Sequence, residues 1–499
     1  MTSAQIIIVV TIVLYLVAMV FVGVYFGKKG SGSSSDDFYL GGRKMGPVVT
    51  AMSAEASDMS SYLLMGLPGL AYLCGLPEVT WTAIGLAIGT YLNWLIVARR
   101  LRRYSAKLGA ITIPDFFARR FGDKKHLLSC IAAVVILIFF IPYTASGFKA
   151  IGTLFNSLFG VEYHTAMIVG GIVVVLYTVM GGFMAVSFTD LIQSIFMTIA
   201  LIVIVCFGVQ QAGGLDTVID NARALPGYLN MTQGYDAASG TASTYSALSI
   251  VSTLAWGLGY FGMPHILVRY LSIKSEHEMR KSQIIGCSWI LVILAMSAVV
   301  GVIGRQFLGE IDNENLVFVH MVRRLFPAFI SGVLLSAILA AAMSTADSQL
   351  LASSSAFASD IYKPVIRKDA TDHEMQWAGR IIVILISVVA YFIAADPNCG
   401  GIMALVECAW AGFGSAFGPV ILLSLYWRRL TYSGAVAGVC VGFAVDALWY
   451  AFLSTPTGLY EIIPGFLCGL IAAVVVSLCS KAPSKEVTDL FDRAFEPTD

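Results

Sequence analysis

Apolar segments of about 20 residues recur along the whole chain, and they limit the possible folds more than any other feature. Each segment is long enough to cross the hydrocarbon core of a bilayer as a helix. Of the 499 residues, 58% are apolar and only 12% are charged, about half the charge of a typical soluble domain. The net charge is zero, so no global field attracts polyanions. The sequence predicts an all-α polytopic membrane protein and argues against a water-soluble globule or a nucleic-acid-binding protein.

About thirteen transmembrane helices can be drawn, and they form a single transmembrane domain over 1–499. The first is too long and too poorly flanked for a cleaved signal peptide, so it is interpreted as a retained helix. The predicted spans are 4–27, 46–75, 80–98, 127–157, 163–181, 187–211, 245–271, 282–304, 327–358, 375–395, 400–427, 432–454 and 459–480.

Lysine and arginine lie mostly in alternate loops, which predicts the orientation of the chain. Of the 31 basic residues, 26 fall on one side of the predicted topology, and basic loops face the cytoplasm. The N-terminus is therefore expected outside and the C-terminus inside. In this count Arg269 belongs to a cytoplasmic loop. The exterior segment 212–244 is predicted to be a solvated loop, residues 111–121 a short helix on the membrane face, and 481–499 a loose cytoplasmic tail.

The second span contains two acids near its middle, Glu55 and Asp58, among several serines. Charges inside a bilayer are expensive, and small polar side chains compete with helical backbone bonds. This pattern predicts a broken helix whose free carbonyls bind a cation and whose half-helix N-terminus binds a carboxylate. The alternative is a continuous helix in which the serines bond back to the preceding turn.

The seventh span is also interrupted, by three glycines and a proline in the string WGLGYFGMP at 256–264, which does not suit a regular helix. Trp256 and Tyr260 share one face there, either as packing residues or as walls of a small-solute pocket. The two broken spans are five apart and cross in opposite directions, which points to inverted repeats with a central site. The repeats are predicted at 46–211 and 245–427, with extra helices before them and at 432–480.

The ninth span places hydroxyls and a carboxylate on adjoining faces, at Ser344, Thr345, Asp347 and Ser348. Hard oxygen ligands suit Na⁺, although serine and threonine alone also serve small-residue helix packing. Asp190, at the start of the sixth span, is expected just inside the membrane interface. Because no Lys or Arg is expected at mid-depth, a bound cation would neutralise Asp58 and Asp347.

Enzyme signatures such as HExxH, GxSxG or a Walker loop are absent from the sequence, so we expect a protein that is not an enzyme. The nine cysteines form no CxxC pair and suggest neither a metal centre nor a disulfide framework. Without an ATP-binding motif, uphill transport has to draw on an ion gradient. A channel and a membrane sensor are the two other classes that such a chain leaves open.

Several long strings make the chain resemble the sodium/solute symporter family, in the branch that carries L-proline. The resemblance implies a leucine-transporter-like fold, with two inverted five-helix repeats and alternating access. It also implies a secondary symporter of the bacterial inner membrane that imports L-proline with Na⁺. The alternative is a Na⁺-coupled symporter of the same fold that carries another amino acid or an organic anion. The strings are DFYLGGR at 37–43, ASDMS at 56–60, LLMGLPG at 63–69, WGLGYFG at 256–262, LSAILA at 335–340, WAGFGSAFGP at 410–419 and YEIIPG at 460–465.

The resemblance also implies which residues bind the ion and the solute. Asp58 matches the acid that family members need for sodium coupling. The sodium ligands would be the carbonyls of Ala56, Met59 and Ala341 and the hydroxyls of Ser344 and Thr345. A further cation site, present in some relatives, would match Asp190, Ser344, Asp347 and Ser348, which leaves open whether one or two Na⁺ accompany the solute. L-Proline would lie near Ser60, Ser61, Tyr143, Trp256, Tyr260 and Pro264.

Overall fold

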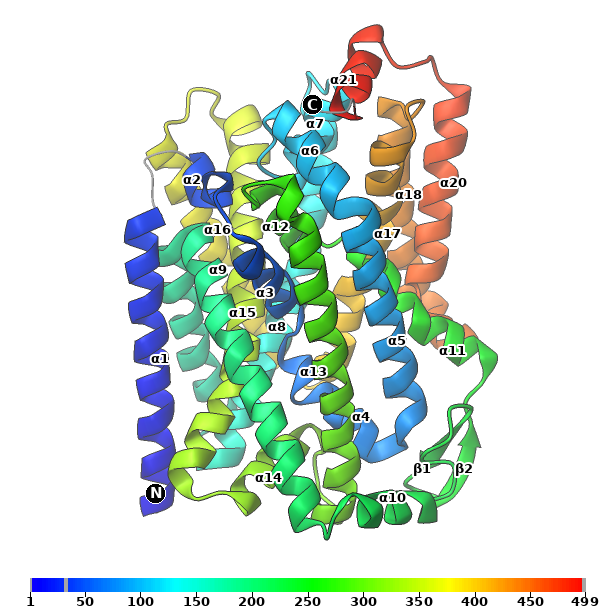
Figure 1. Ribbon diagram of the computed structural model, residues 1–499. Coiled ribbons are helices and arrows are strands. Elements are labelled where there is room, and N and C mark those ends of the chain that lie inside the picture. The colour runs from blue at the N-terminus through cyan, green and yellow to red at the C-terminus, as the bar shows by residue number, and fades with distance from the viewer. Residues whose placement is uncertain (1, 31–34, 496–499) are drawn as a thin grey trace.

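The computed structural model describes residues 2–30 and 35–495, and nearly all of this part of the chain is helical. The long helices run side by side, with the N-terminus at one end of the molecule and the C-terminus at the other (Figure 1). Among the described residues, ten helices are long and apolar enough to cross a membrane. Three shorter apolar helical segments, Ser61–Cys74, Tyr163–Val179 and Ala247–Phe261, fall in the predicted second, fifth and seventh spans. The all-α membrane fold is confirmed, and the exact number of crossings stays a prediction.

The long helices agree closely with the predicted spans. Two of them continue into π-helical turns, α5 into η3 (Asn93–Ala98) and then α6, and α15 into η7 (Ala358–Ile366). The spanning elements are α1 (Ser3–Gly30), α5 (Leu76–Leu92), α6 (Arg99–Leu108), α8 (Leu127–Phe159), α9 (Tyr163–Gln211), α13 (Met279–Leu308), α15 (Ala328–Phe357), α16 (Asp372–Ala395), α17 (Ile402–Tyr426), α18 (Tyr432–Phe452) and α20 (Ile462–Cys479).

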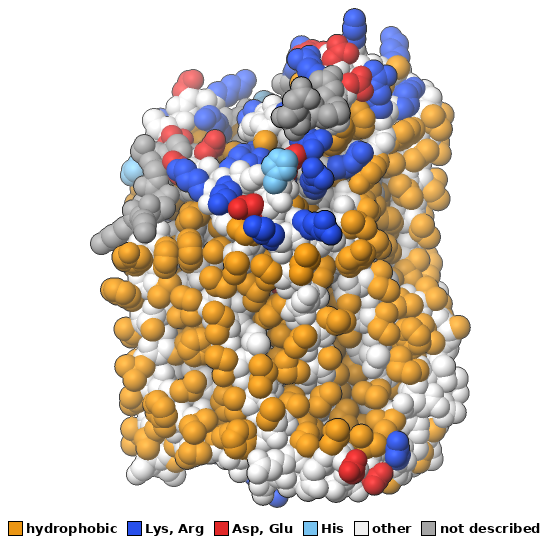
Figure 2. All heavy atoms as spheres, in the orientation of Figure 1, with side chains coloured by type: hydrophobic (Ala, Val, Ile, Leu, Met, Phe, Trp, Pro, Cys, Tyr) orange, Lys and Arg blue, Asp and Glu red, His pale blue; other side chains and the backbone are white. Residues whose placement is uncertain are grey.

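On the face of the molecule that Figure 2 shows, hydrophobic side chains cover the middle in a broad band. Large apolar side chains that a soluble protein would bury are exposed, such as Phe21 at 71% and Phe392 at 67%. Lys and Arg side chains gather at the end that holds the C-terminus. A helix satisfies its own backbone groups within one segment in lipid, so the helical architecture suits this apolar surface.

One predicted loop is a sharp turn between two helices. The fifth and sixth predicted spans lie in α9 as two helical segments that meet at Gly182, where φ is 64° and ψ is −177°. A Cβ at this position would lie 3.0 Å from the ring of Phe38 and 3.2 Å from the Phe38 carbonyl oxygen. Glycine is required there both for the backbone conformation and for the close approach.

Both predicted helix breaks are present. The second span consists of α3 (Pro47–Asp58), η2 (Ser61–Leu63) and α4 (Gly66–Cys74). The seventh consists of α11 (Ala247–Leu254), η4 (Ala255–Phe261) and α12 (Pro264–Ser272). Helix α15 packs against α3, α8 and α9, which places its polar stretch beside the first break.

Two segments expected to be irregular are ordered. Residues 212–244 form α10 (Leu215–Ala224) and a hairpin of β1 (Gln233–Asp236) with β2 (Thr241–Thr244), paired antiparallel. The tail forms α21 (Lys485–Phe495), in which Asp492 accepts from Arg428 at 2.7 Å and Phe491 and Phe495 contact Tyr104. The loose-tail prediction is wrong because this amphipathic helix packs its aromatic rings on α6 and pairs its carboxylate with Arg428 in the turn after α17. Residues 496–499 of the tail lie outside the described residues.

The remaining elements are short connections at the two ends of the bundle. Helix α7 lies within the segment 111–121, as predicted. These elements are α2 (Ser35–Leu40), η1 (Gly41–Arg43), α7 (Ile113–Phe121), η5 (Glu276–Glu278), η6 (Glu314–Leu316), α14 (Val317–Leu325) and α19 (Ser454–Thr457).

Candidate ion and solute site

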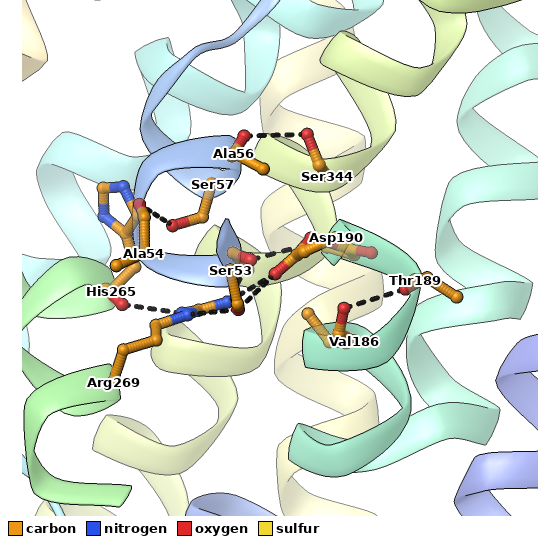
Figure 3. Close-up of polar contacts among 12 residues, drawn as sticks. Ser53, Ala54, Ala56, Ser57, Val186, Thr189, Asp190, His265, Arg269 and Ser344 are labelled. Atoms are coloured by element: carbon orange, nitrogen blue, oxygen red, sulfur yellow. Dashed lines mark hydrogen bonds and ion pairs between the residues drawn. The ribbon is translucent and has the colours of Figure 1, made fainter. Parts of the chain in front are cut away.

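The end of α3 frees a backbone carbonyl and turns it toward α15. In a continuous helix the Ser60 N–H would bond the Ala56 carbonyl, but it donates instead to the Asp58 carbonyl at 2.8 Å. The Ser344 hydroxyl oxygen lies 2.9 Å from the Ala56 oxygen and 3.2 Å from the Ala341 oxygen (Figure 3). The structure therefore brings together three of the oxygens that the resemblance assigns to sodium.

The other two predicted sodium ligands lie close to these in the sequence. Thr345, the neighbour of Ser344, is 3% exposed, and its hydroxyl has no hydrogen-bond partner among the described residues. Met59 is buried at the C-cap of α3. Buried polar groups are normally satisfied, so an unpartnered hydroxyl beside carbonyl oxygens fits a site for a hard cation.

Asp58, at the last turn of α3, contacts two residues that were predicted to bind solute. The Tyr260 hydroxyl, on η4, donates to the Asp58 carboxylate, and the Tyr143 hydroxyl, on α8, donates to the Asp58 carbonyl at 3.2 Å. All three residues are buried. The predicted coupling acid is thus bonded directly to two residues of the predicted solute pocket, from different helices.

Trp256 lies in an aromatic group that links the two breaks. Its ring stacks on Tyr62 of η2 with centroids 6.0 Å apart and an interplanar angle of 16°, and lies 5.7 Å from Tyr460. The Trp410 indole N–H donates to the Trp256 carbonyl at 2.6 Å. These contacts are packing contacts, and the role of Trp256 as a pocket wall stays a prediction.

The predicted solute residues of the first break lie in and next to η2. Ser60 is its N-cap and accepts from the Tyr62 N–H at 3.3 Å, and the Ser61 hydroxyl is buried without a partner among the described residues. Pro264 lies elsewhere, at the start of α12, where it lines a cavity of about 20 Å³ with Arg269 and Ser348. That volume holds about one water molecule.

Arg269 is a basic residue that the charge count placed in a cytoplasmic loop, and the structure corrects this assignment. It lies on α12, not in a loop, and is 1% exposed. Its Nη2 lies 3.2 Å from Asp190 Oδ2, and Ser53 donates to the same oxygen at 2.6 Å (Figure 3). Asp190 is fully buried inside the protein, and its place relative to the membrane interface stays a prediction. The sequence feature that indicated burial of Arg269 was its position inside an apolar run, five residues after Pro264. The charge count assigned Arg269 to a loop instead.

The residues of the predicted second cation site meet only partly. Ser348 accepts a hydrogen bond from Arg269 and donates to Asp347 Oδ1 at 3.4 Å. Asp347 Oδ2 has no partner within the described part of the chain. Ser344 lies one helical turn away, with the Ala56 carbonyl. Asp190 and Ser348 are therefore joined through Arg269.

Glu55 is a further buried acid, whose Oε1 accepts from the Trp94 indole N–H at 2.7 Å. Sequence reasoning placed this acid in the broken span but missed its partner, because Trp94 belongs to the π-helical turn of another span.

Comparison with known proteins places these features in a family. Residues 38–442 match the model of the Sodium:solute symporter family. The chain belongs to this family. Among curated family relatives, the osmoregulated proline transporter OpuE of Bacillus subtilis is 43% identical over 97% of this chain and 97% of the relative. The sodium/proline symporter of Escherichia coli is 42% identical over 97% of this chain and 95% of the relative.

Solved structures show the same fold. The substrate-bound outward-open state of a Na⁺-coupled sialic acid symporter aligns with a TM-score of 0.79 at 19% identity, covering 96% of this chain and 98% of that one. Mhp1, a nucleobase-cation-symport-1 family transporter, aligns with a TM-score of 0.56 over 92% of this chain and 98% of the other at 14% identity. The symporter family and its fold therefore agree with the broken helices of this chain.

Proposed function

We propose that this chain is a secondary active symporter, not an enzyme, that imports L-proline together with Na⁺ by alternating access. The observation that carries the proposal is the bonding of Asp58 to Tyr143 and Tyr260, beside the oxygens of Ala56 and Ser344. Ion and solute would share one broken helix there. The choice of proline is supported by relatives above 40% identity that are named as proline transporters or sodium/proline symporters.

In this proposal, Na⁺ lies between α3 and α15. The carbonyls of Ala56, Met59 and Ala341 and the hydroxyls of Ser344 and Thr345 are its ligands. An ion there holds the end of α3 against α15, which fixes Asp58 one residue before Met59. Because Asp58 bonds Tyr143 and Tyr260, the same ion sets the position of both tyrosines. Sodium binding thus prepares the solute pocket, which is the physical basis for coupling.

The solute pocket in this proposal lies between the two breaks. Proline is a zwitterion whose carboxylate suits a half-helix N-terminus, here that of η2 or α4. Its apolar ring suits the aromatic group around Trp256 and Tyr260. Ser60 and Ser61 supply hydroxyls at the start of η2, and Pro264 starts α12.

The proposed location is a bacterial cytoplasmic membrane, with the N-terminus outside and the C-terminus inside. The gathering of Lys and Arg at the C-terminal end supports this orientation (Figure 2). The two inverted repeats are proposed at about 46–211 and 245–427. One Na⁺ suffices energetically, since a charge crossing 100 mV yields ~2.3 kcal/mol and a tenfold gradient ~1.4 kcal/mol. Together they support roughly 500-fold accumulation.

Uptake by proteoliposomes tests the proposal. The purified protein is reconstituted, and an inward Na⁺ or H⁺ gradient is imposed with a panel of labelled amino acids and organic anions. We expect saturable, uphill uptake of L-proline that needs Na⁺. Uptake of a different solute instead would overturn the choice of proline, and flux that neither saturates nor runs uphill would indicate a channel.

A further inference from the structure

Helix α7 carries a second deeply buried arginine, Arg120, far along the chain from the ion site. Its side chain is 0% exposed. Helices α6 and α21 pack against α7 at the end of the molecule that holds the C-terminus (Figure 1). Arg120 Nε donates to the Ser424 carbonyl of α17 at 3.4 Å, but Nη1 and Nη2 have no hydrogen-bond partner among the described residues. Two nitrogens of a charged group are therefore buried without a partner.

The acids near Arg120 are bonded to other groups. Asp115 accepts from the arginine one place before Arg120 at 2.7 Å, and Asp123 accepts from backbone N–H groups at the start of α8. Asp492, on the helix that covers α7, accepts from Arg428 with both carboxylate oxygens. The described part of the chain thus offers no carboxylate to Nη1 or Nη2 of Arg120.

Aromatic rings surround the guanidinium instead. Its Cζ lies 5.0 Å from the ring centroids of Phe121 and Phe491 and 5.6 Å from that of Tyr104 on α6. A cation–π contact returns much less free energy than a buried charge loses with its hydration shell. The rings also lower the local dielectric, which strengthens the attraction of any counter-charge. The aromatic contacts alone therefore do not explain the burial of Arg120.

Two hydroxyls beside Arg120 are also buried without partners. They belong to Tyr104, whose ring faces the guanidinium, and to Ser424, whose carbonyl accepts from Arg120 Nε. Both residues are 0% exposed. Buried polar groups without a protein partner indicate an ordered water or an ion. Because the group at the centre carries a full positive charge, an anion satisfies this set of donors better than water.

We propose that Arg120, Tyr104 and Ser424 bind one small monovalent anion, chloride or an ion of similar size, beneath α21. One guanidinium balances one negative charge, and the enclosure by rings excludes a phosphate or a lipid headgroup. Phe491 of α21 covers the site, so the bound anion stabilises the docking of this helix on α6 and α7. The site uses none of the residues proposed to bind Na⁺ or solute, and the inference does not rest on the proposed function.

Thermal unfolding of the full-length protein in detergent tests the site. Na⁺ and ionic strength are held constant while chloride replaces gluconate in steps. We expect the unfolding temperature to rise by a few degrees and to saturate with chloride, and equilibrium dialysis with radioactive chloride should give about one bound ion per protein. Bromide should replace chloride, whereas phosphate should not.

Four substitutions locate the ion. Arg120→Gln should abolish both the temperature shift and the bound chloride. Tyr104→Phe and Ser424→Ala each remove one hydroxyl, and each should raise the chloride concentration for half of the shift about tenfold, since each loses a hydrogen bond to a charged group. Arg119→Gln is the matched control, because its side chain on the same helix is 49% exposed, and it should respond to chloride as the wild type does.

The absence of a chloride effect in the wild type overturns the proposal, and so does an effect that persists in Arg120→Gln. If Arg120→Gln does not fold, an unchanged chloride dependence in both Tyr104→Phe and Ser424→Ala overturns it. A chloride effect that appears only when Glu496→Gln and Asp499→Asn are combined would assign the counter-charge to the chain's own acids, and would overturn it too. None of these results depends on transport, so a failure of the proposed function would be seen separately.

Discussion

The two broken helices are interrupted for different physical reasons. In the first, between α3 and α4, polar groups near the break take other partners: the Ser57 hydroxyl bonds the Ala54 carbonyl at 2.9 Å, and the Ser60 hydroxyl accepts from the Tyr62 N–H. In the second, at η4, glycines let neighbouring helices approach. A Cβ on Gly259 would lie 2.0 Å from Trp410 Nε1, and one on Gly262 would lie 2.1 Å from the Phe413 carbonyl oxygen.

This difference indicates that the two breaks have different roles. The first break is built from side chains that are themselves polar, so it presents carbonyls, hydroxyls and a carboxylate to an ion. The second break is set by close packing from α5 and α17, so it presents aromatic rings held in fixed positions. Substitutions in the first should change ion dependence with little cost in stability, whereas substitutions in the second should change stability or solute binding.

The largest effect is expected in the first break, from Asp58→Asn. The variant keeps the shape of the side chain but loses the charge that the Tyr260 hydroxyl bonds. A hydrogen bond to a charged group contributes about 1.5–3 kcal/mol, so the Na⁺ concentration for half-maximal uptake should rise about ten- to a hundredfold or uptake should vanish.

Transport assays across a range of Na⁺ concentrations measure this effect. Asp216→Asn, at an exposed position on α10, is the matched control and should behave as wild type. A near-normal Na⁺ dependence in Asp58→Asn would remove the first break from the coupling mechanism.

The second largest effect concerns stability in the second break. Gly259→Ala forces a methyl group against the Trp410 indole that bonds the Trp256 carbonyl. Overpacking of this kind costs about 1–3 kcal/mol. We expect a clear loss of thermal stability in detergent, measured by the loss of monodisperse protein on heating.

The control for Gly259→Ala is Gly46→Ala, because an added Cβ at Gly46 meets nothing within 4 Å. In the first break, Ser57→Ala removes one bond within its own helix and should cost at most about 1 kcal/mol. Equal destabilisation by Ser57→Ala and Gly259→Ala would contradict the division between the two breaks.

Both breaks could be predicted from the sequence, because serines beside acids and clustered glycines act locally. The neighbours of the second break could not, since the approach of Trp410 depends on α17, which lies about 150 residues further along the chain. Arg269 was misplaced for a related reason. A charge count assigns a basic residue to a loop, and only the packing of Ser53, Asp190 and Ser348 around it makes burial tolerable. The ion pair is therefore a property of tertiary structure that one segment alone does not reveal.

Trp256→Ala tests whether the second break contributes to solute binding. Loss of the indole removes the stack on Tyr62 and the wall predicted for the proline ring. Removing an apolar contact from a pocket costs about 1–3 kcal/mol, so proline affinity at saturating Na⁺ should fall about tenfold or more. A proline affinity within twofold of the wild-type value would show that the aromatic group serves packing alone. Trp377→Ala, at a position that is 51% exposed on α16, is the control.

The smallest effect is expected from Thr345→Ala, which tests whether α15 completes the ion site of the first break. The Thr345 hydroxyl is buried beside Ser344 without a partner among the described residues, so its removal leaves the folded helix intact. If it ligates Na⁺, the concentration for half-maximal uptake should rise about five- to tenfold, the value of one hydrogen-bond-sized interaction. Thr178→Ala removes an equally buried hydroxyl that bonds the Val174 carbonyl of its own helix, and should leave the Na⁺ dependence unchanged. An unchanged Na⁺ dependence in Thr345→Ala would confine the ion to α3, and the contact between Ser344 and Ala56 would then be helix packing.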